Sequence, residues 1–171
     1  MTDEVTDDPY LDQWIKDAEA KSKPGTVRGV FNKSAPCHAA RCNTAVSAAE
    51  NDLVLLVTEE VVIVQDCWLE ELVRTFIHAD IVAAIPQHHN PGDAKILATD
   101  NILGLKNTNE STLCGHAELG ENGYLDSMKL ARDASTLPST CFLIRKTAYQ
   151  QAGGMDETEL GDYLGDSDLG L

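Results

Sequence analysis

The sequence predicts an α/β fold with a mixed, mostly parallel central sheet flanked by helices. Segments with helical periodicity alternate along the chain with short apolar segments of strand length. The apolar strand segments are nearly continuous, which is typical of strands covered on both faces in a parallel sheet. With 171 residues, 43% of them hydrophobic, the chain is long enough for one ordinary domain with its own core.

The first 25 residues are acidic and polar, and we expect them to form a helical segment ahead of the domain. The helix should run from Pro9 to about Lys21, since Asp8 can cap it and proline suits the first helical position. Trp14 lies on the apolar face of this helix. We expect it to pack the helix against the domain rather than to stack on a base.

Residues 26–171 form the expected α/β domain. It opens with a short strand at residues 26–32 (TVRGVFN) and an alanine-rich helix from about Pro36 to Ala49. Residues 52–58 (DLVLLVT) are a continuous apolar run of strand length. Such a run predicts a strand that is buried on both faces.

The clearest helix follows at residues 65–79 (QDCWLEELVRTFIHA). Asp66 is its expected cap, and two glutamates lie in the early turns, where negative charge suits the helix dipole. The apolar side chains recur at helical spacing and predict one stripe that faces the core. The stripe consists of Trp68, Leu69, Leu72, Val73, Phe76 and Ile77.

The second half of the domain has two more strands around a weakly patterned region. Residues 81–87 (IVAAIPQ) and 139–145 (STCFLIR) are the expected strands. Residues 87–137 are rich in Asn, Gly, Thr and Asp, which is typical of a functional loop region. A short helix at residues 146–154 (KTAYQQAGG) should end at its glycines, before an acidic closing stretch.

The chain is strongly acidic, with 28 acidic against 13 basic residues and a formal net charge of −15. Such a field repels nucleic acid and anionic lipid, so we expect no nucleic-acid partner. Divalent cations are natural ligands for this charge, and an anionic substrate would need a metal or a local basic patch. Most of the acids are expected to serve solubility.

The five cysteines form no C-x-x-C pair, which predicts a reducing compartment without a disulfide framework. A zinc site of Cys37, His38 and Cys42 fits none of the usual ligand spacings. His88 and His89 are expected as loop residues. No apolar run reaches membrane-spanning length and no signal peptide opens the chain, so we expect a cytoplasmic protein, with peripheral attachment to a membrane as a second location.

Two groups of carboxylates lie at the ends of predicted elements. Glu59 and Glu60 come directly after the apolar strand at residues 52–58, and Asp166 and Asp168 lie in the closing stretch. Ligands of open α/β sheets gather at the carboxyl ends of strands. Paired carboxylates there can hold Mg²⁺ or Mn²⁺, and a further acid can act as a general base. Acid pairs on solvated turns are common, so this pattern alone does not name a function.

Four stretches, taken in order, resemble the family 2 glycosyltransferases, which have the GT-A fold. Residues 31–61 are similar to that family's asparagine-containing helix and the strand that ends in its D-x-D motif. The sequence DCWLEELVRTF resembles the helix that follows, and STCFLIRKTAYQQAGGMDE resembles the strand and the "GGFDE" segment. The closing YLGDSDLGL resembles the "E-D-x-D-L-x-L-R" motif.

The resemblance implies transfer of a sugar from a nucleotide-sugar donor to a saccharide or lipid-linked acceptor, with Mn²⁺ or Mg²⁺ as cofactor. Thr58, Glu59 and Glu60 occupy the place of the D-x-D motif and are the implied metal site. Asp166 falls on the family's general base, and Asp168 falls on the next acid of that motif.

The resemblance also implies a set of substrate-binding residues. Gly153, Gly154, Met155 and Asp156 fall on the segment that lines the acceptor side. Asn43 can orient a loop near the donor, although a solvent-facing helix asparagine fits the sequence equally well. Arginines such as Arg145 can meet phosphate, but strand-end arginines are more often structural.

The chain departs from the family at several positions. A threonine, Thr58, replaces the first metal aspartate, and Gly165 replaces the acid before the base. The family's opening strand and helix, which hold the nucleotide base, have no counterpart in residues 1–25. We therefore expect a fold that is incomplete on its N-terminal side, from a fragment, a truncated form or a divergent relative. An incomplete sheet has an open edge, which predicts self-association.

Three interpretations remain open. The first is a metal-dependent, inverting glycosyltransferase or its core, with Glu60 at the metal and Asp166 as the base. The second is an inactive glycosyltransferase-like module that binds a partner or needs another chain; Thr58 and the missing opening strand favour it. The third is an acidic α/β domain whose motif order arose by chance.

Overall fold

The computed structural model describes residues 9–23, 30, 37–93, 95–98, 102–105, 108–110, 117–118, 120–123, 126, 128–162 and 164–170. The strand predicted at residues 26–32 lies outside these segments, apart from Val30.

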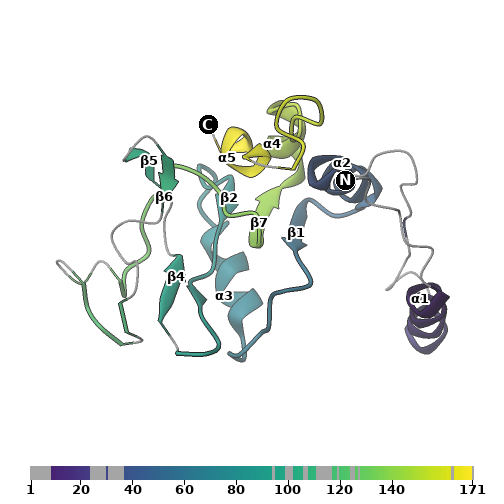
Figure 1. The fold of residues 1–171 in the computed structure, drawn as a ribbon, viewed down its shortest axis with the longest axis horizontal. Coiled ribbons are helices and arrows are strands. Elements are labelled where there is room, and N and C mark those ends of the chain that lie inside the picture. Colours follow the sequence, from purple (N-terminus) through teal and green to yellow (C-terminus); the bar gives the residue numbers. More distant parts are fainter. Residues whose placement is uncertain are drawn as a thin grey trace.

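A three-stranded sheet in the order β1-β7-β2 forms the centre of the fold (Figure 1). Both β1 (Leu53–Val57) and β2 (Ala83–Ala84) pair antiparallel with β7 (Cys141–Arg145). It follows that β1 and β2 run in the same direction, with β7 reversed between them. The expectation of a mostly parallel sheet is wrong for these strands, because apolar runs fit a covered antiparallel strand equally well.

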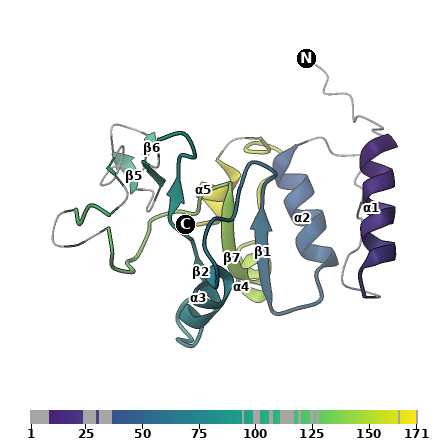
Figure 2. The same cartoon turned by 90° about the horizontal axis from the view of Figure 1, so that it is seen from below.

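Helices cover both faces of this sheet, as Figures 1 and 2 show. One face carries α2 (His38–Ala48), α4 (Lys146–Gln151) and α5 (Gly165–Leu169), and the other carries α3 (Trp68–Thr75). Side chains of the central strand β7 contribute to the hydrophobic cores on both faces of the sheet. Its Phe142 and Ile144 pack in the cluster that includes α2 and α5 residues, whereas Leu143 packs with Leu72 of α3 and with Phe76, which follows that helix.

Four of the predicted elements are confirmed with small changes of their bounds. These are α1 (Pro9–Lys21), α2, β7 and α4. The strand β1 is also present, but it is not buried along its whole length. Only Val54 of β1 is buried, and Val57 is 46% exposed, because β1 lies at the edge of the sheet.

The helix α3 differs from its prediction at its start and along its stripe. Cys67, with φ 61°, occupies the cap position without a side-chain hydrogen bond, so Asp66 is one residue too early to cap. Leu72 and Phe76 are buried and Trp68 is half-buried. The remaining stripe residues, Leu69, Val73 and Ile77, are 39%, 43% and 82% exposed. The sheet is too narrow beneath α3 to cover them, since β2 has only two residues.

The N-terminal helix α1 does not pack as predicted. Trp14 is 66% exposed and Tyr10 is 85% exposed. Both views show α1 standing to one side of the sheet and its helices (Figures 1 and 2). Trp14 therefore does not hold α1 against the domain, and the described structure offers no surface to that side chain.

Between β2 and β7 the chain forms two small antiparallel pairs. β3 (His88–His89) pairs with β4 (Ile96–Ala98), and β5 (Ile102–Leu105) pairs with β6 (Thr108–Glu110). The predicted loop region thus contains regular structure, because strands of two to four residues are too short to show a periodicity in the sequence. The predicted strand at residues 81–87 is reduced to the half-buried Ala83 and Ala84. Among the described helices, none is both long and apolar enough to cross a membrane.

The Arg145 guanidinium closes the carboxyl end of α3. Its Nε donates to the Ile81 carbonyl at 2.9 Å, and a terminal nitrogen donates to the Phe76 carbonyl at 2.9 Å. The guanidinium also lies 5.2 Å from the centre of the Phe76 ring, a cation–π distance. Arg145 is therefore a structural residue that joins β7 to α3, and its donors are not directed at a phosphate site.

Replacing Arg145 with Met should lower the free energy of unfolding by about 2–3 kcal/mol, because half-buried carbonyls would lose a charged donor. Urea unfolding at pH 7 measures the change. Arg74→Met is the matched control, since the ion pair of Arg74 with Glu71 (2.6 Å) is exposed. We expect the control to lose less than about 0.5 kcal/mol. Equal losses in the two variants would contradict this role of Arg145.

Candidate functional site

The side chain of Asn43, in the middle of α2, joins that helix to the segment after α4. Its Nδ2 donates to the Met155 carbonyl at 2.9 Å and to Glu157 Oε1 at 2.7 Å. Its Oδ1 accepts from the Tyr149 hydroxyl at 2.5 Å and from the Met155 N–H at 3.0 Å. Two donors and two acceptor positions are the full capacity of an amide. Asn43 therefore neither faces solvent nor has a free group for a donor loop.

Gly153 and Gly154 allow this contact. Both have positive φ, 92° and 79°, which glycine adopts at little cost. A Cβ on Gly154 would lie 2.7 Å from Asn43 Oδ1, too close for any side chain. The glycine pair thus brings the backbone at Met155 against α2, and Met155 is buried in the core. Burial raises the pKa of Tyr149, so its hydroxyl remains a neutral donor to Asn43.

Two open hollows flank Asn43. One, of about 280 Å³, lies between α2 and α4 and is lined by Asn43, Tyr149, Gly153 and Gly154 among others. The other, of about 520 Å³, lies on the far side of Asn43 and includes Glu157. Neither hollow is lined by Asp166 or by Thr58, Glu59 and Glu60. The glycine segment therefore borders a cavity, but the predicted catalytic acid does not.

Several acids of the closing stretch are used within the fold. Asp156 Oδ1 accepts from the Glu159 N–H at 3.1 Å and from the N–H and hydroxyl of Thr158 at 2.7 and 2.8 Å. These hydrogen bonds lower the pKa of Asp156, and the bond from the Glu159 N–H has the largest effect. Asp162 accepts from the His38 N–H at 3.0 Å, which caps α2 where its own cap residue, Cys37, cannot. These two carboxylates organise turns and a helix end.

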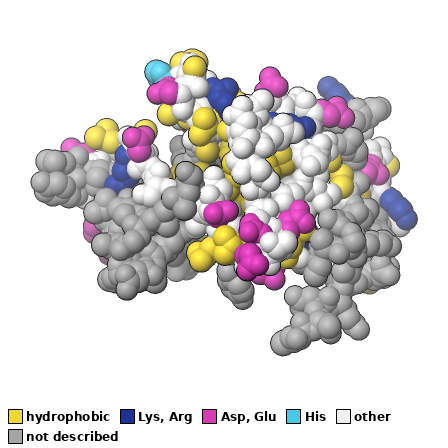
Figure 3. All heavy atoms as spheres, turned by 90° about the horizontal axis from the view of Figure 1, so that it is seen from above, with side chains coloured by type: hydrophobic (Ala, Val, Ile, Leu, Met, Phe, Trp, Pro, Cys, Tyr) yellow, Lys and Arg dark blue, Asp and Glu magenta, His cyan; other side chains and the backbone are white. Residues whose placement is uncertain are grey.

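Asp166 lies in the first turn of α5, which packs on α2. A Cβ on Gly165 would lie 3.6 Å from Met155 Cβ and 3.9 Å from Ala39 Cβ, and Leu169 is buried in the same core. Asp166 is half-buried, and burial raises the pKa of its carboxyl; nearby backbone N–H groups and His38 lower it by less. Asp168 is exposed. In Figure 3, acidic side chains gather on the face that α2, α4 and α5 cover.

The start of α2 also places Cys42 beside His38. The Sγ of Cys42 lies 3.4 Å from His38 Nε2, and Cys42 is 8% exposed. Burial raises the pKa of the Cys42 thiol to about 11, so it stays protonated at neutral pH. Within the described part of the chain, no three His, Cys, Asp or Glu side chains are grouped to hold a metal ion.

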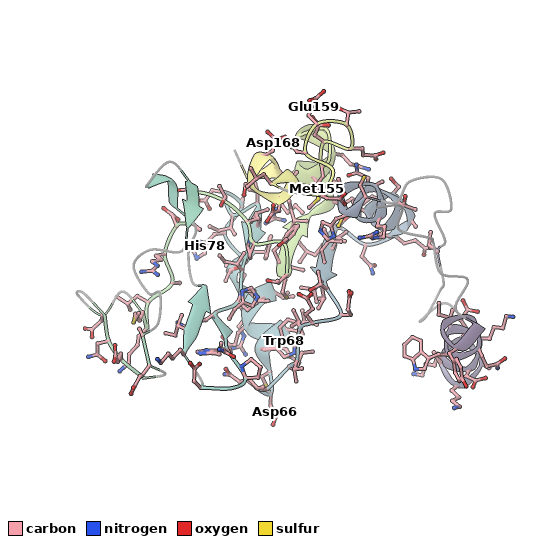
Figure 4. The ribbon with its side chains drawn as sticks, in the orientation of Figure 1. Asp66, Trp68, His78, Met155, Glu159 and Asp168 are labelled. Carbon is pink, nitrogen blue, oxygen red and sulfur yellow. The ribbon has the colours of Figure 1, made fainter. Side chains whose placement is uncertain are left out.

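Thr58, Glu59 and Glu60 follow β1, as predicted. The Thr58 N–H donates to the Thr140 carbonyl at 2.9 Å, and its hydroxyl lies 3.4 Å from the same oxygen. Glu59 and Glu60 form an exposed turn. From there the chain leads to Asp66 and Trp68 on the α3 side, whereas Asp168 and Met155 lie on the opposite side of the sheet (Figure 4). Within the described segments, no hydrogen bond or ion pair joins the Glu59–Glu60 turn to Asp166.

His88 and His89, which the sequence analysis placed in a loop, form β3 instead and are candidate site residues. The Nε2 of His88 and the Nδ1 of His89 are buried, and neither atom has a hydrogen-bond partner among the described residues. Burial, and then the neighbouring His89, lowers the pKa of His88. Buried polar atoms are rarely left unpaired, so each is available to a bound group. Adjacent histidines were the only signal in the sequence, and it gave no information on burial.

Asn43→Ala should lower the free energy of unfolding by about 2–4 kcal/mol, because it leaves the Tyr149 hydroxyl and the Met155 N–H without their acceptor. Chemical denaturation measures the loss. Asn51→Ala, at an exposed position just before β1, is the control and should change stability by less than about 0.5 kcal/mol. Unchanged stability in Asn43→Ala would show that the amide does not join the two segments.

The lowered pKa of His88 predicts a pH-dependent stability. Below the ordinary histidine pKa of about 6.5, the unfolded chain binds a proton that folded His88 resists. The free energy of unfolding should therefore fall as the pH drops from 7 to 5. His88→Gln should flatten that fall, and His78→Gln, at an exposed position, should leave it unchanged. Identical pH profiles for wild type and His88→Gln would contradict the burial of this ring.

Comparisons with known proteins name no function for the chain. No protein-family model matches it, and no solved structure matches it. A curated protein of Sinorhizobium fredii (strain NBRC 101917 / NGR234), described as "Uncharacterized protein y4gI", is 28% identical over 133 residues, or 75% of this chain. Those residues span only 14% of that relative's own length. The chain is therefore similar to a short part of a much longer protein.

Proposed function

We propose that the chain is the core of a metal-dependent, inverting glycosyltransferase, which transfers a sugar from a nucleotide-sugar donor to an acceptor hydroxyl. The observation that carries this proposal is the contact of Asn43 with Met155, over 112 residues of sequence. It joins two of the four stretches on which the family resemblance rests. The closing stretch, YLGDSDLGL, contains Asp166 and packs against both of them through Gly165.

Asp166 is the proposed general base. A half-buried carboxylate with a raised pKa holds a proton more strongly than an exposed one, which suits proton removal from a hydroxyl. In the proposed step, the acceptor oxygen bonds to the anomeric carbon as the bond to the diphosphate oxygen breaks. The hydroxyl proton passes to Asp166. Attack opposite the leaving group inverts the configuration of that carbon.

Thr58, Glu59 and Glu60 are the proposed holders of Mg²⁺ or Mn²⁺. Their donor set fits a cation that shares its ligands with substrate, since the two exposed carboxylates are adjacent and the described residues add no third acid. Mg²⁺ is often held in this way, by one or two carboxylates together with phosphates and water. When bound, the cation would supply positive charge to the diphosphate leaving group.

The remaining proposed contacts are on the acceptor side. Gly153, Gly154 and Met155 contribute backbone there, next to the hollow beside Asn43. Asp156 and Asp168 offer carboxylate oxygens to sugar hydroxyls, although Asp156 Oδ1 is already used by its own turn. The proposed compartment is the cytoplasm, and the free thiols of Cys37, Cys42, Cys67 and Cys141 support a reducing one.

A second candidate function is an inactive glycosyltransferase-like module that binds a partner or a nucleotide sugar. Two observations favour it. The Thr58 hydroxyl is directed at the Thr140 carbonyl, and a neutral hydroxyl is a weak ligand in any case. The Glu59–Glu60 turn and Asp166 share no hydrogen bond or common cavity among the described residues.

Calorimetric titration of UDP, GDP and their sugar conjugates, with and without Mn²⁺, tests the donor site, and sugar transfer to an acceptor then distinguishes the enzyme from an inactive module that binds a nucleotide sugar. Metal-dependent binding of one nucleotide supports the donor site and names the class of donor. Glu60→Gln should then weaken the metal dependence. Absence of binding by a folded sample favours the inactive module.

Asp166→Asn should lower turnover by about 10²–10⁴-fold, the usual contribution of a general base, and leave nucleotide affinity unchanged. Stability should rise slightly at pH 7. Because the pKa of Asp166 is raised on folding, the folded form binds more protons and loses stability as the pH rises through the interval between the two pKa values. Glu159→Gln, at an exposed position, is the control. Full turnover in Asp166→Asn would exclude Asp166 as the base.

A further inference from the structure

The outer edge of β1 presents unpaired backbone groups. The Asp52 carbonyl accepts from the Lys146 N–H at 2.8 Å, and the Thr58 N–H donates to the Thr140 carbonyl at 2.9 Å. Even-numbered residues of β1 therefore face β7, and Leu53, Leu55 and Val57 direct their N–H and C=O groups away from it. No hydrogen bond joins these outward groups to another described residue.

This edge lacks the features that usually protect an edge strand. The five residues, LVLLV, include no charge and no proline, and they pair with β7 in an unbroken register without a bulge. Their side chains alternate between the two cores, so β1 is packed on both faces. Figures 1 and 2 show α2 reaching past β1 on the side away from β7. The backbone of β1 is thus a ready template for one more strand.

The charges at both ends of β1 indicate which side chains the added strand has. Glu50 and Asp52 precede it, and Glu59 and Glu60 follow it, all four of them exposed. From residue 42 to residue 73 the sequence has no Lys or Arg. A second copy of the chain, paired antiparallel, would bring the acids of one strand end against those of the other, which is unfavourable. The expectation of self-association through the open edge is therefore replaced by a partner of opposite charge.

We propose that the outer edge of β1 binds an extended polypeptide segment with an apolar centre and basic residues at both ends. The segment adds a strand to the sheet through the backbone of Leu53, Leu55 and Val57. Its basic ends meet Asp52 at one end of β1 and the pair Glu59 and Glu60 at the other. Recognition by strand addition draws affinity from the backbone and selectivity from the flanking side chains. The backbone contacts are independent of the proposed sugar transfer, whereas Glu59 and Glu60 are also the proposed metal holders, so peptide and metal would compete for that end of β1.

Fluorescence anisotropy with short labelled peptides tests the proposal. The first peptide has alternating Val and Thr flanked by two lysines on each side; the second has glutamates in place of the lysines. We expect saturable, salt-sensitive binding of the lysine peptide and at least about tenfold weaker binding of the glutamate peptide. Equal affinity for both peptides, or no binding of either at millimolar concentration, would overturn the proposal.

Val57→Pro is the decisive variant, because it removes an outward N–H that the fold does not use. Val57→Thr is its matched control, since it is also β-branched and keeps the N–H. The proline variant should bind the lysine peptide at least about tenfold more weakly than the threonine variant. Equal binding by the two would exclude the edge, and thermal melts establish that both are folded.

If Val57→Pro does not fold, the variant Asp52→Lys replaces it. This variant should prefer the glutamate peptide more than wild type does, and an unchanged preference would overturn the charge assignment. Light scattering completes the test. A dimer of the wild type that Val57→Pro converts to a monomer would mean that a second copy fills the edge, which also overturns the proposal.

Discussion

The fold depends on one amide. Asn43 satisfies all four of its hydrogen-bonding positions across α2, α4 and the segment at Met155. That contact fixes the backbone after the glycine pair, and the fixed backbone in turn positions the turn that caps α2 through Asp162. Helix α5 packs onto the result through Gly165 and Leu169. A side chain that forms every bond available to it specifies geometry more strictly than apolar packing does, because any shift leaves a buried group unpaired.

This arrangement divides the acids of the closing stretch into two kinds. Asp156 and Asp162 are engaged by backbone N–H groups and organise the chain around Asn43. Asp166 is half-buried with a raised pKa, a condition that costs stability and therefore calls for another explanation. Catalytic sites often retain residues that lower the stability of the fold, whereas a solvated surface acid does not lower it. Among the described acids, Asp166 is the one whose pKa burial raises, and it is therefore the focus of the proposed function.

Local patterns predicted the helices and the two principal strands, since apolar spacing, proline at Pro9 and the glycines after α4 act over a few residues. Strand direction could not be predicted in this way, because LVLLV and CFLIR look alike in either orientation. The exposure of Leu69, Val73 and Ile77 was equally hidden, as it depends on a two-residue β2. The role of Asn43 was hidden for the same reason: its partners lie over a hundred residues away. The burial of His88 likewise depends on a strand that sequence periodicity did not indicate.

The exposed helix α1 has a consequence for spectroscopy. The chain has two tryptophans, one in α1 and one beside the sheet. Trp14 is largely in water and Trp68 is half-buried against the α3 cluster. Intrinsic emission therefore has a constant, red-shifted component from the first indole and a component from the second that responds to its surroundings. The change on denaturation reports the α3 side of the sheet alone, and the face that carries Asn43 needs a different optical label.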